Sequence, residues 1–159
     1  MKVLWAPWRM EYILSKKNRD CLFCGAPRES RDRDNLVLCR GESAYVIMNK
    51  YPYNNGHLMV VPYFHTSTFE GLTDGDMLEI MRLTAFSVDC LKKAFHPEGF
   101  NVGINIGEVA GAGIKEHLHM HIVPRWAGDA GFMTAVGEAR VIPEHILDTY
   151  DKLHPLFNP

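Results

Sequence analysis

The sequence lacks long apolar runs and has no strong excess of charge of either sign. Nowhere do eighteen apolar residues follow one another, and residues 1–9 lack the apolar core of a secretion signal. The 17 basic and 19 acidic residues are mixed along the chain and give a net charge of −2. We therefore expect a cytoplasmic protein that binds neither nucleic acid nor membranes and whose partner is a small molecule.

Cysteine is also scarce, with four residues in the chain of 159. In a reducing cytosol these cysteines are not expected to form structural disulfides. Cys39 and Cys90 stand alone and are predicted to be ordinary buried thiols. Cys21 and Cys24 form a Cys-x-x-Cys pair, which is compatible with metal binding, with redox chemistry or with no function.

The length and the 47% hydrophobic content predict one domain with a sizeable core. Residues 1–35 are irregular, with aromatic residues at the start and many charges between Arg28 and Asp34, which indicates an arm that ends in a solvated loop. The periodic part, residues 36–126, is expected to form the core. Residues 127–159 are expected to form a tail with a short helix.

Hydrophobic periodicity predicts five strands and two helices. The predicted strands are residues 36–39, 44–48, 57–61, 100–106 and 116–123. The long helix begins at Thr73 and is ended by His96-Pro97, and the last helix covers residues 143–153 with Pro143 in its first turn. The stripe of the long helix that should cover the sheet contains Met77, Ile80, Met81, Thr84, Val88, Leu91 and Phe95. This order predicts an α+β fold with an antiparallel sheet.

Three histidines alternate with apolar residues in the last predicted strand. On a strand, His117, His119 and His121 share one face, and the residues between them share the other. Each buried imidazole carries a donor and an acceptor that need partners, so the histidines are poor core material. A polar ligand is therefore expected to face them.

An open catalytic metal site, nucleophilic catalysis and a solvated edge strand all remain possible for these histidines. The metal site is disfavoured because no carboxylate follows closely and Glu116 points to the opposite face of a regular strand. In nucleophilic catalysis, one neutral imidazole attacks phosphorus and neighbouring donors stabilise the phosphoryl charge. The glycine-rich loop of residues 107–113 precedes the histidines and lets backbone amides approach a phosphate.

The segment His117-Leu118-His119-Met120-His121-Ile122-Val123 resembles the signature of the histidine triad family of nucleotide hydrolases and transferases. The resemblance extends over about residues 20–126 and includes Asn49-Lys50, the segment 56–62, His65, Asn105 and Pro124-Arg125. It implies a five-stranded antiparallel sheet in each subunit and a homodimer with a continuous larger sheet.

The same resemblance implies roles for individual residues. His119 is the expected nucleophile on the α-phosphorus, with a backbone carbonyl near the triad fixing its tautomer. His121 and the preceding loop are expected to contact phosphate oxygens, and Asn105 to help hold the phosphate. Asn49 is expected to reach the ribose. His57 is expected to be a structural histidine.

Zinc-bearing relatives, including galactose-1-phosphate uridylyltransferases, are similar in joining a Cys-x-x-Cys pair to two histidines. In this chain the resemblance assigns Cys21, Cys24, His65 and His117. Two thiolates and two imidazoles make a closed tetrahedral site, which is structural and not catalytic. An empty reduced thiol pair is the alternative, and redox chemistry is a weaker one.

One substitution separates this chain from the best-known hydrolase branches, which carry a glutamine four residues before the triad where this chain has Gly113. Together with the segments 4–13 and 124–129, this pattern resembles the bacterial diadenosine tetraphosphate phosphorylases. Those enzymes give the nucleotidyl group to orthophosphate, which the backbone amides of Gly111, Gly113 and Ile114 are able to bind. Hydrolysis of phosphoramidates or dinucleoside polyphosphates by water, and a non-catalytic nucleotide-binding module, are the alternatives.

Overall fold

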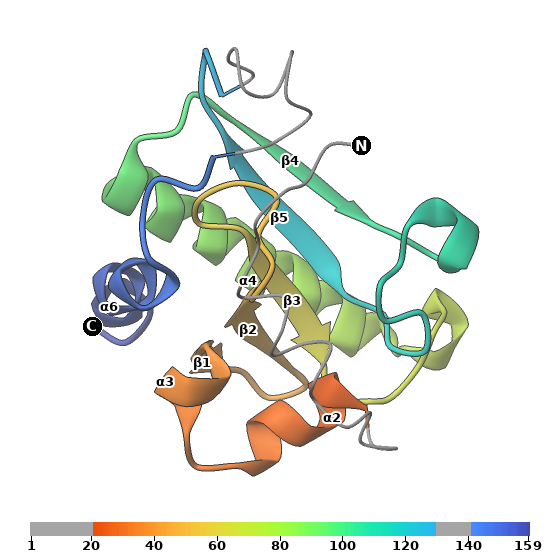
Figure 1. Ribbon diagram of the computed structural model, residues 1–159. Helices are drawn as coiled ribbons and strands as arrows, with labels where there is room; N and C mark the ends of the chain where they lie inside the picture. Colours follow the sequence, from red (N-terminus) through yellow and green to blue (C-terminus); the bar gives the residue numbers. More distant parts are fainter. Residues whose placement is uncertain (1–20, 130–140) are drawn as a thin grey trace, which may run out of the picture.

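The computed structural model describes residues 21–129 and 141–159, so the predicted aromatic arm of residues 1–20 lies outside the described residues. Its centre is a five-stranded antiparallel sheet with the order β1-β2-β3-β5-β4 (Figure 1). The strands are β1 (Val37–Arg40), β2 (Ala44–Met48), β3 (Leu58–Pro62), β4 (Gly99–Ile104) and β5 (Met120–Arg125). The predicted α+β fold is confirmed.

The described helices are one long helix, one C-terminal helix and several single turns. They are α2 (Leu22–Gly25), α3 (Asp32–Asn35), α4 (Asp74–Phe95) and α6 (Ile146–Phe157), with 3-10 turns at Ala26–Arg28, Phe69–Gly71 and Glu108–Ala110. No helix in these ranges is both long and apolar enough to cross a membrane.

Helix α4 packs against β2, β3 and β5 and covers one face of the sheet. It begins as predicted, because Thr73 and Asp76 form a reciprocal capping box. Ile80, Thr84 and Leu91 are buried, but Met81 is 55% exposed, so its predicted place in the buried stripe is wrong. Met81 follows Ile80 directly and therefore lies about 100° around the helix from it.

Helix α6 contacts α4 and β1. It starts later than the predicted residue 143, because the Nδ1 atom of His145 accepts a hydrogen bond from the amide of Leu147 and caps the helix there. Pro143 therefore lies before the helix, and Pro155 lies inside its last turns.

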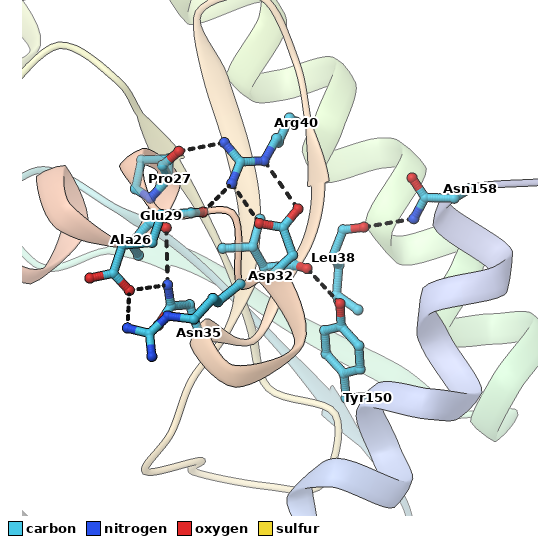
Figure 2. A network of polar contacts seen from close by, with 11 residues as sticks. Ala26, Pro27, Glu29, Asp32, Asn35, Leu38, Arg40, Tyr150 and Asn158 are labelled. Atoms are coloured by element: carbon cyan, nitrogen blue, oxygen red, sulfur yellow. Dashed lines mark hydrogen bonds and ion pairs between the residues drawn. The ribbon is translucent and has the colours of Figure 1, made fainter.

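A polar network joins the segment after Cys24 to β1 (Figure 2). The Arg40 guanidinium donates to the carbonyl oxygens of Pro27 and Glu29 and forms an ion pair with Asp32 at 2.5 Å. The residues between Arg28 and Asp34 are mostly exposed, as predicted for a solvated loop, but they include the start of α3 and are held by these bonds. The network therefore holds the segment that follows the Cys-x-x-Cys pair against β1.

The predicted histidine strand differs most from the structure. Strand β5 begins at Met120, so His117 and His119 lie before it and not within it. The amide of Leu118 donates to the Thr66 carbonyl at 2.6 Å, and the ring of His117 bonds to the Pro62 carbonyl at 2.8 Å. These contacts hold the segment against the chain that follows β3 and keep it out of the regular ladder.

Candidate functional site

The structure brings the three predicted histidines together in a buried cluster. The ring centroids of His119 and His121 are 4.7 Å apart, and both side chains are less than 9% exposed. His117 lies two residues earlier and turns toward the cysteine pair. The three imidazoles therefore belong to one site but have different partners.

The orientation of His119 is fixed by its own backbone neighbourhood. Its Nδ1 atom lies 2.8 Å from the carbonyl oxygen of His117, so Nδ1 carries the proton and donates it. The lone pair of Nε2 is then available to a substrate. Burial lowers the pKa of His119, which favours the neutral ring that a nucleophile requires. The carbonyl partner that the resemblance implied for His119 is present.

The proton positions of His121 follow from a chain of hydrogen bonds. The amide of Tyr53 donates to Nδ1 of His57 at 3.0 Å, so a neutral His57 carries its proton on Nε2. That Nε2 donates to Nδ1 of His121 at 2.9 Å, which places the His121 proton on Nε2. Among the described residues, Nε2 of His121 is buried without a partner. It is therefore a buried hydrogen-bond donor that is free to bind a ligand.

Burial keeps both members of this pair neutral. It lowers the pKa of His57 to about 3 and the pKa of His121 to about 4. His57 was predicted to be a structural histidine, and the sequence did not link it to the triad. The link depends on the antiparallel pairing of β3 with β5, in which Met59 lies opposite His121.

Cys21, Cys24, His65 and His117 form a cluster whose ligand atoms all lie within 4.8 Å of one another. Nδ1 of His117 lies 3.3 Å from Sγ of Cys21 and 3.2 Å from Nδ1 of His65. Because Nε2 of His117 donates to the Pro62 carbonyl, its Nδ1 presents a lone pair to the cluster. Ligand atoms around a tetrahedral zinc ion are about 3.3 to 3.8 Å apart, so the donor set fits that ion.

The aromatic residue of the Cys-x-x-Cys turn packs beside two histidines of the triad. Phe23 is 2% exposed, and its ring centroid is 4.9 Å from that of His119 and 5.6 Å from that of His117. Its carbonyl oxygen accepts a hydrogen bond from the Tyr45 hydroxyl at 2.7 Å. The turn that supplies both thiols therefore also packs a ring against the candidate nucleophile.

The two predicted asparagines lie near the site in different ways. The side-chain oxygen of Asn49 accepts the amide of Tyr51 at 2.9 Å, and its nitrogen lies 3.4 Å from Nδ1 of His57. Asn105 follows β4, and its side-chain nitrogen lies 3.9 Å from the position that a Cβ atom would take on Gly111. Asn105 therefore lies beside the glycine-rich loop, and its phosphate role stays a prediction.

The glycine-rich loop is partly closed on itself. The amide of Gly111, whose φ is 91°, donates to the Glu108 carbonyl at 3.0 Å, and the amide of Ala112 donates to the Gly107 carbonyl at 3.3 Å. The Gly111 amide is therefore used in a hydrogen bond within the loop. The phosphate contacts predicted for Gly113 and Ile114 stay a prediction.

Comparison with known proteins finds a family model and several proteins that are similar to this chain. A family model described as HIT domain matches residues 30–128. An AP-4-A phosphorylase of Mycobacterium tuberculosis is 44% identical over 154 residues, covering 92% of this chain and 79% of that protein. An adenosine 5'-monophosphoramidase of Schizosaccharomyces pombe is 27% identical over 126 residues, covering 79% of this chain and 90% of that protein.

The solved structures agree on the fold. A zinc-bound histidine triad family protein from Mycobacterium smegmatis aligns with a TM-score of 0.69 at 22% sequence identity. The alignment covers 87% of this chain and 94% of that chain.

Proposed function

Because the chain belongs to the HIT domain family, we propose that it transfers the nucleotidyl group of an adenine nucleotide such as diadenosine tetraphosphate to orthophosphate. The observation that carries this proposal is the His119 imidazole, with one nitrogen bound to the His117 carbonyl and the other presented to a substrate. The 44% identity to an AP-4-A phosphorylase over most of the chain supports the choice of substrate and acceptor.

In the first step, Nε2 of His119 attacks the α-phosphorus. A nitrogen–phosphorus bond forms, and the bond from the α-phosphorus to the bridging oxygen breaks, with ATP leaving on that oxygen. The developing positive charge on the ring is stabilised by the Nδ1 proton donated to the His117 carbonyl. The His121 Nε2 proton is the donor for a nonbridging phosphate oxygen, where charge builds up in the transition state.

In the second step, an oxygen of orthophosphate attacks the nucleotidyl-histidine. The nitrogen–phosphorus bond breaks, its electron pair returns to Nε2 of His119, and ADP is released. The amides of Gly113 and Ile114 are the proposed donors to this anion, with Asn105 beside them. Asn49 is proposed to bind the ribose, next to the His57 ring.

We propose zinc as the occupant of the Cys21, Cys24, His65 and His117 cluster, because the donor types and their spacing suit that ion. A zinc ion bound there supplies no chemistry to the reaction; it holds four side chains in one geometry. The cluster fixes His117, whose carbonyl orients His119, and it fixes the turn that carries Phe23.

A homodimer is proposed from the exposed edge of the sheet. Strand β4 is the last strand of the sheet, and Asn101, Val102 and Gly103 on it are exposed. Val102 is 46% exposed although it lies on the same face as the buried Ile122. An exposed apolar edge strand is able to pair with a second copy, which supports the dimer.

Hydrolysis with water as the acceptor is the second candidate. The likeness to an adenosine 5'-monophosphoramidase favours it, because phosphoramidates present the same α-phosphorus to the nucleophile. A non-catalytic nucleotide-binding module is disfavoured, because binding alone does not require a neutral imidazole with a fixed tautomer at His119.

Product analysis with and without orthophosphate tests the proposal. The protein and diadenosine tetraphosphate are expected to give ADP and ATP only when orthophosphate is present. AMP and ATP in both conditions would instead establish a hydrolase.

A His119→Asn variant is the control for the nucleophile. It is expected to bind nucleotide normally and to lose turnover, and full activity in this variant would overturn the assignment of His119.

A further inference from the structure

A shallow pocket lies next to the triad, on the same face of the sheet. It is lined by Pro52, Tyr53, Asn101, Val123 and Arg125. Side chains at alternate positions of β5 share a face, so Val123 and Arg125 continue the row that begins at His121. Asn101 lies opposite Val123 on β4 and joins the same row. None of these five side chains has a role in the transfer steps described above.

One wall of the pocket is aromatic and touches the triad. The Tyr53 ring is stacked on His121, with centroids 5.6 Å apart and planes 28° apart, and it also contacts His57. It is nevertheless 48% exposed. An exposed aromatic ring beside a nucleotide-processing site is a suitable platform for a base.

The other wall is a guanidinium group held in a fixed plane. Arg125 donates through Nε and Nη2 to both oxygens of Asp129, at 2.6 and 2.9 Å, and through Nη1 to Asn101 at 2.7 Å. Asp129 is only 9% exposed and also accepts from Asn54 at 2.9 Å. The Arg125 side chain remains 40% exposed.

This arrangement suits a base better than a phosphate. The Asp129 carboxylate neutralises the Arg125 charge and would repel a phosphate group, but it leaves a rigid planar cation. A guanidinium plane stacks on aromatic rings, and the Asn101 amide has the donor and acceptor types that bind base edges. The pocket therefore combines two stacking surfaces, a small apolar floor and one amide.

The position of the pocket across the sheet selects a particular base. Asn49, the proposed ribose ligand, follows β2, whereas Asn101 and Arg125 lie on β4 and β5, on the other side of β3. Arg125 also lies four strand positions beyond His121, about 13 Å along β5. A nucleoside whose ribose binds at Asn49 is therefore directed to the β2 side of the site, and the leaving nucleotide is the one directed along β5 toward Arg125.

We infer that this pocket binds the nucleobase of the leaving nucleotide. The inference rests on the proposed function and deepens it. It makes the enzyme selective for dinucleoside polyphosphates over substrates with one nucleoside, and Arg125, Asn101 and Tyr53 determine that selectivity.

The test compares kcat/KM for diadenosine tetraphosphate with kcat/KM for adenosine 5'-phosphoramidate, which has no second nucleoside. Arg125→Met removes the planar group, and Asn101→Trp fills the pocket from an exposed strand position. The ratio of the two kcat/KM values is expected to fall at least tenfold in both variants. Met81→Trp is the control, since it adds the same bulk at an exposed position of α4 outside the pocket, and its ratio should equal that of the unchanged protein.

Equal loss of both activities, or an unchanged ratio in folded variants, would overturn the pocket assignment. A binding experiment separates this result from a failure of the proposed function. In the His119→Asn background, diadenosine tetraphosphate is expected to bind at least tenfold more tightly than AMP, and Arg125→Met should remove this preference. Loss of the preference together with normal turnover in His119→Asn would support the pocket and contradict the nucleophile.

Discussion

In the proposed reaction, the reactivity of His119 depends on one hydrogen bond and one aromatic contact. The His117 carbonyl sets the tautomer, and the Phe23 ring packs against the imidazole at 4.9 Å. Neither group touches the substrate in the proposed reaction, so both are positioning groups. A change in either one should alter the rate of transfer more than the binding of the nucleotide.

Phe23→Ala is expected to lower kcat at least tenfold with a smaller change in KM, because the nucleophile loses the ring that limits its rotation. Phe23→Leu fills more of the space and should recover a large part of kcat. Truncating a buried phenylalanine also costs about 3 to 5 kcal/mol of stability, so the assays belong well below the midpoint of thermal unfolding. An unchanged kcat in folded Phe23→Ala protein would show that the contact is only structural.

The buried histidine pair predicts a loss of stability in acid. The folded pKa values of about 3 for His57 and about 4 for His121 lie below the value of about 6.5 expected in the unfolded chain. The unfolded chain therefore binds protons as the pH falls below 6.5, and the folded chain does not. At pH 5 this lowers the free energy of unfolding by about 2 kcal/mol for each histidine.

Urea unfolding at pH 7.5, 6 and 5 measures this effect. Stability should be constant above pH 7 and fall between pH 6.5 and pH 4, and His57→Gln should show a shallower fall. Equal free energies of unfolding at pH 7.5 and pH 5 would mean that the pair is not held neutral.

At the scale of single residues, the alternating histidines indicated a neutral imidazole nucleophile, and the family resemblance assigned this role to His119 and supplied the four residues of the metal cluster. The structure shows a carbonyl bonded to His119 and the proximity of the four cluster residues. The partnership of His57 with His121 was not predictable, since it joins positions 64 residues apart through sheet pairing. A lone histidine at a strand start carries no local signal for such a contact.

Among the elements, the single turn α2 contributes both to the packing of the fold and to the proposed site. It is too short to be a stable helix alone; Cys21 is its N-cap residue, Cys24 lies within it, and Phe23 is its buried residue. Its carbonyls, thiols and ring all point to different parts of the site. We therefore expect metal binding to decide whether this turn is in place.

The purified protein, prepared without chelator, is expected to contain about one zinc ion per chain. Cys24→Ser should lose the metal and lower the midpoint of thermal unfolding by at least about 5 °C, because a loss of 1 kcal/mol corresponds to roughly 2 to 4 °C in a domain of this size. Cys39→Ser is the matched control, since Cys39 is a free thiol outside the cluster. A metal content near zero in the unchanged protein would contradict the zinc assignment.

The boundaries of elements were predictable where local signals exist. The capping box at Thr73 and the run of strand residues at 44–48 placed α4 and β2 correctly. The start of β5 was not predictable, because the alternating pattern continues through His117 and His119 while distant carbonyls of Pro62 and Thr66 hold those residues off the ladder. The alternation of polar and apolar residues alone does not show which residues pair with a neighbouring strand.

At the scale of the whole molecule, the exposed β4 edge of the sheet has no further strand beside it among the described residues. Light scattering at micromolar concentration is expected to give the mass of a dimer. Val102→Lys places a charge on that edge and should shift the protein toward the monomer, because a lysine on an edge strand opposes pairing with another chain. Val141→Lys is the control, since Val141 is also exposed but lies outside the sheet. A monomeric mass for the unchanged protein would contradict the dimer.

The fold as a whole brings distant parts of the chain to one nucleophile, including the turn at Phe23, the carbonyl of His117 and the pair of His57 with His121. The central claim is that His119 becomes covalently nucleotidylated. Rapid acid-free quenching of the protein with diadenosine tetraphosphate in the absence of orthophosphate, followed by mass spectrometry, tests it most directly. The account predicts an added nucleoside monophosphate on His119 that disappears when orthophosphate is supplied, with ADP formed. Turnover without such an adduct, or an adduct on another residue, would contradict it.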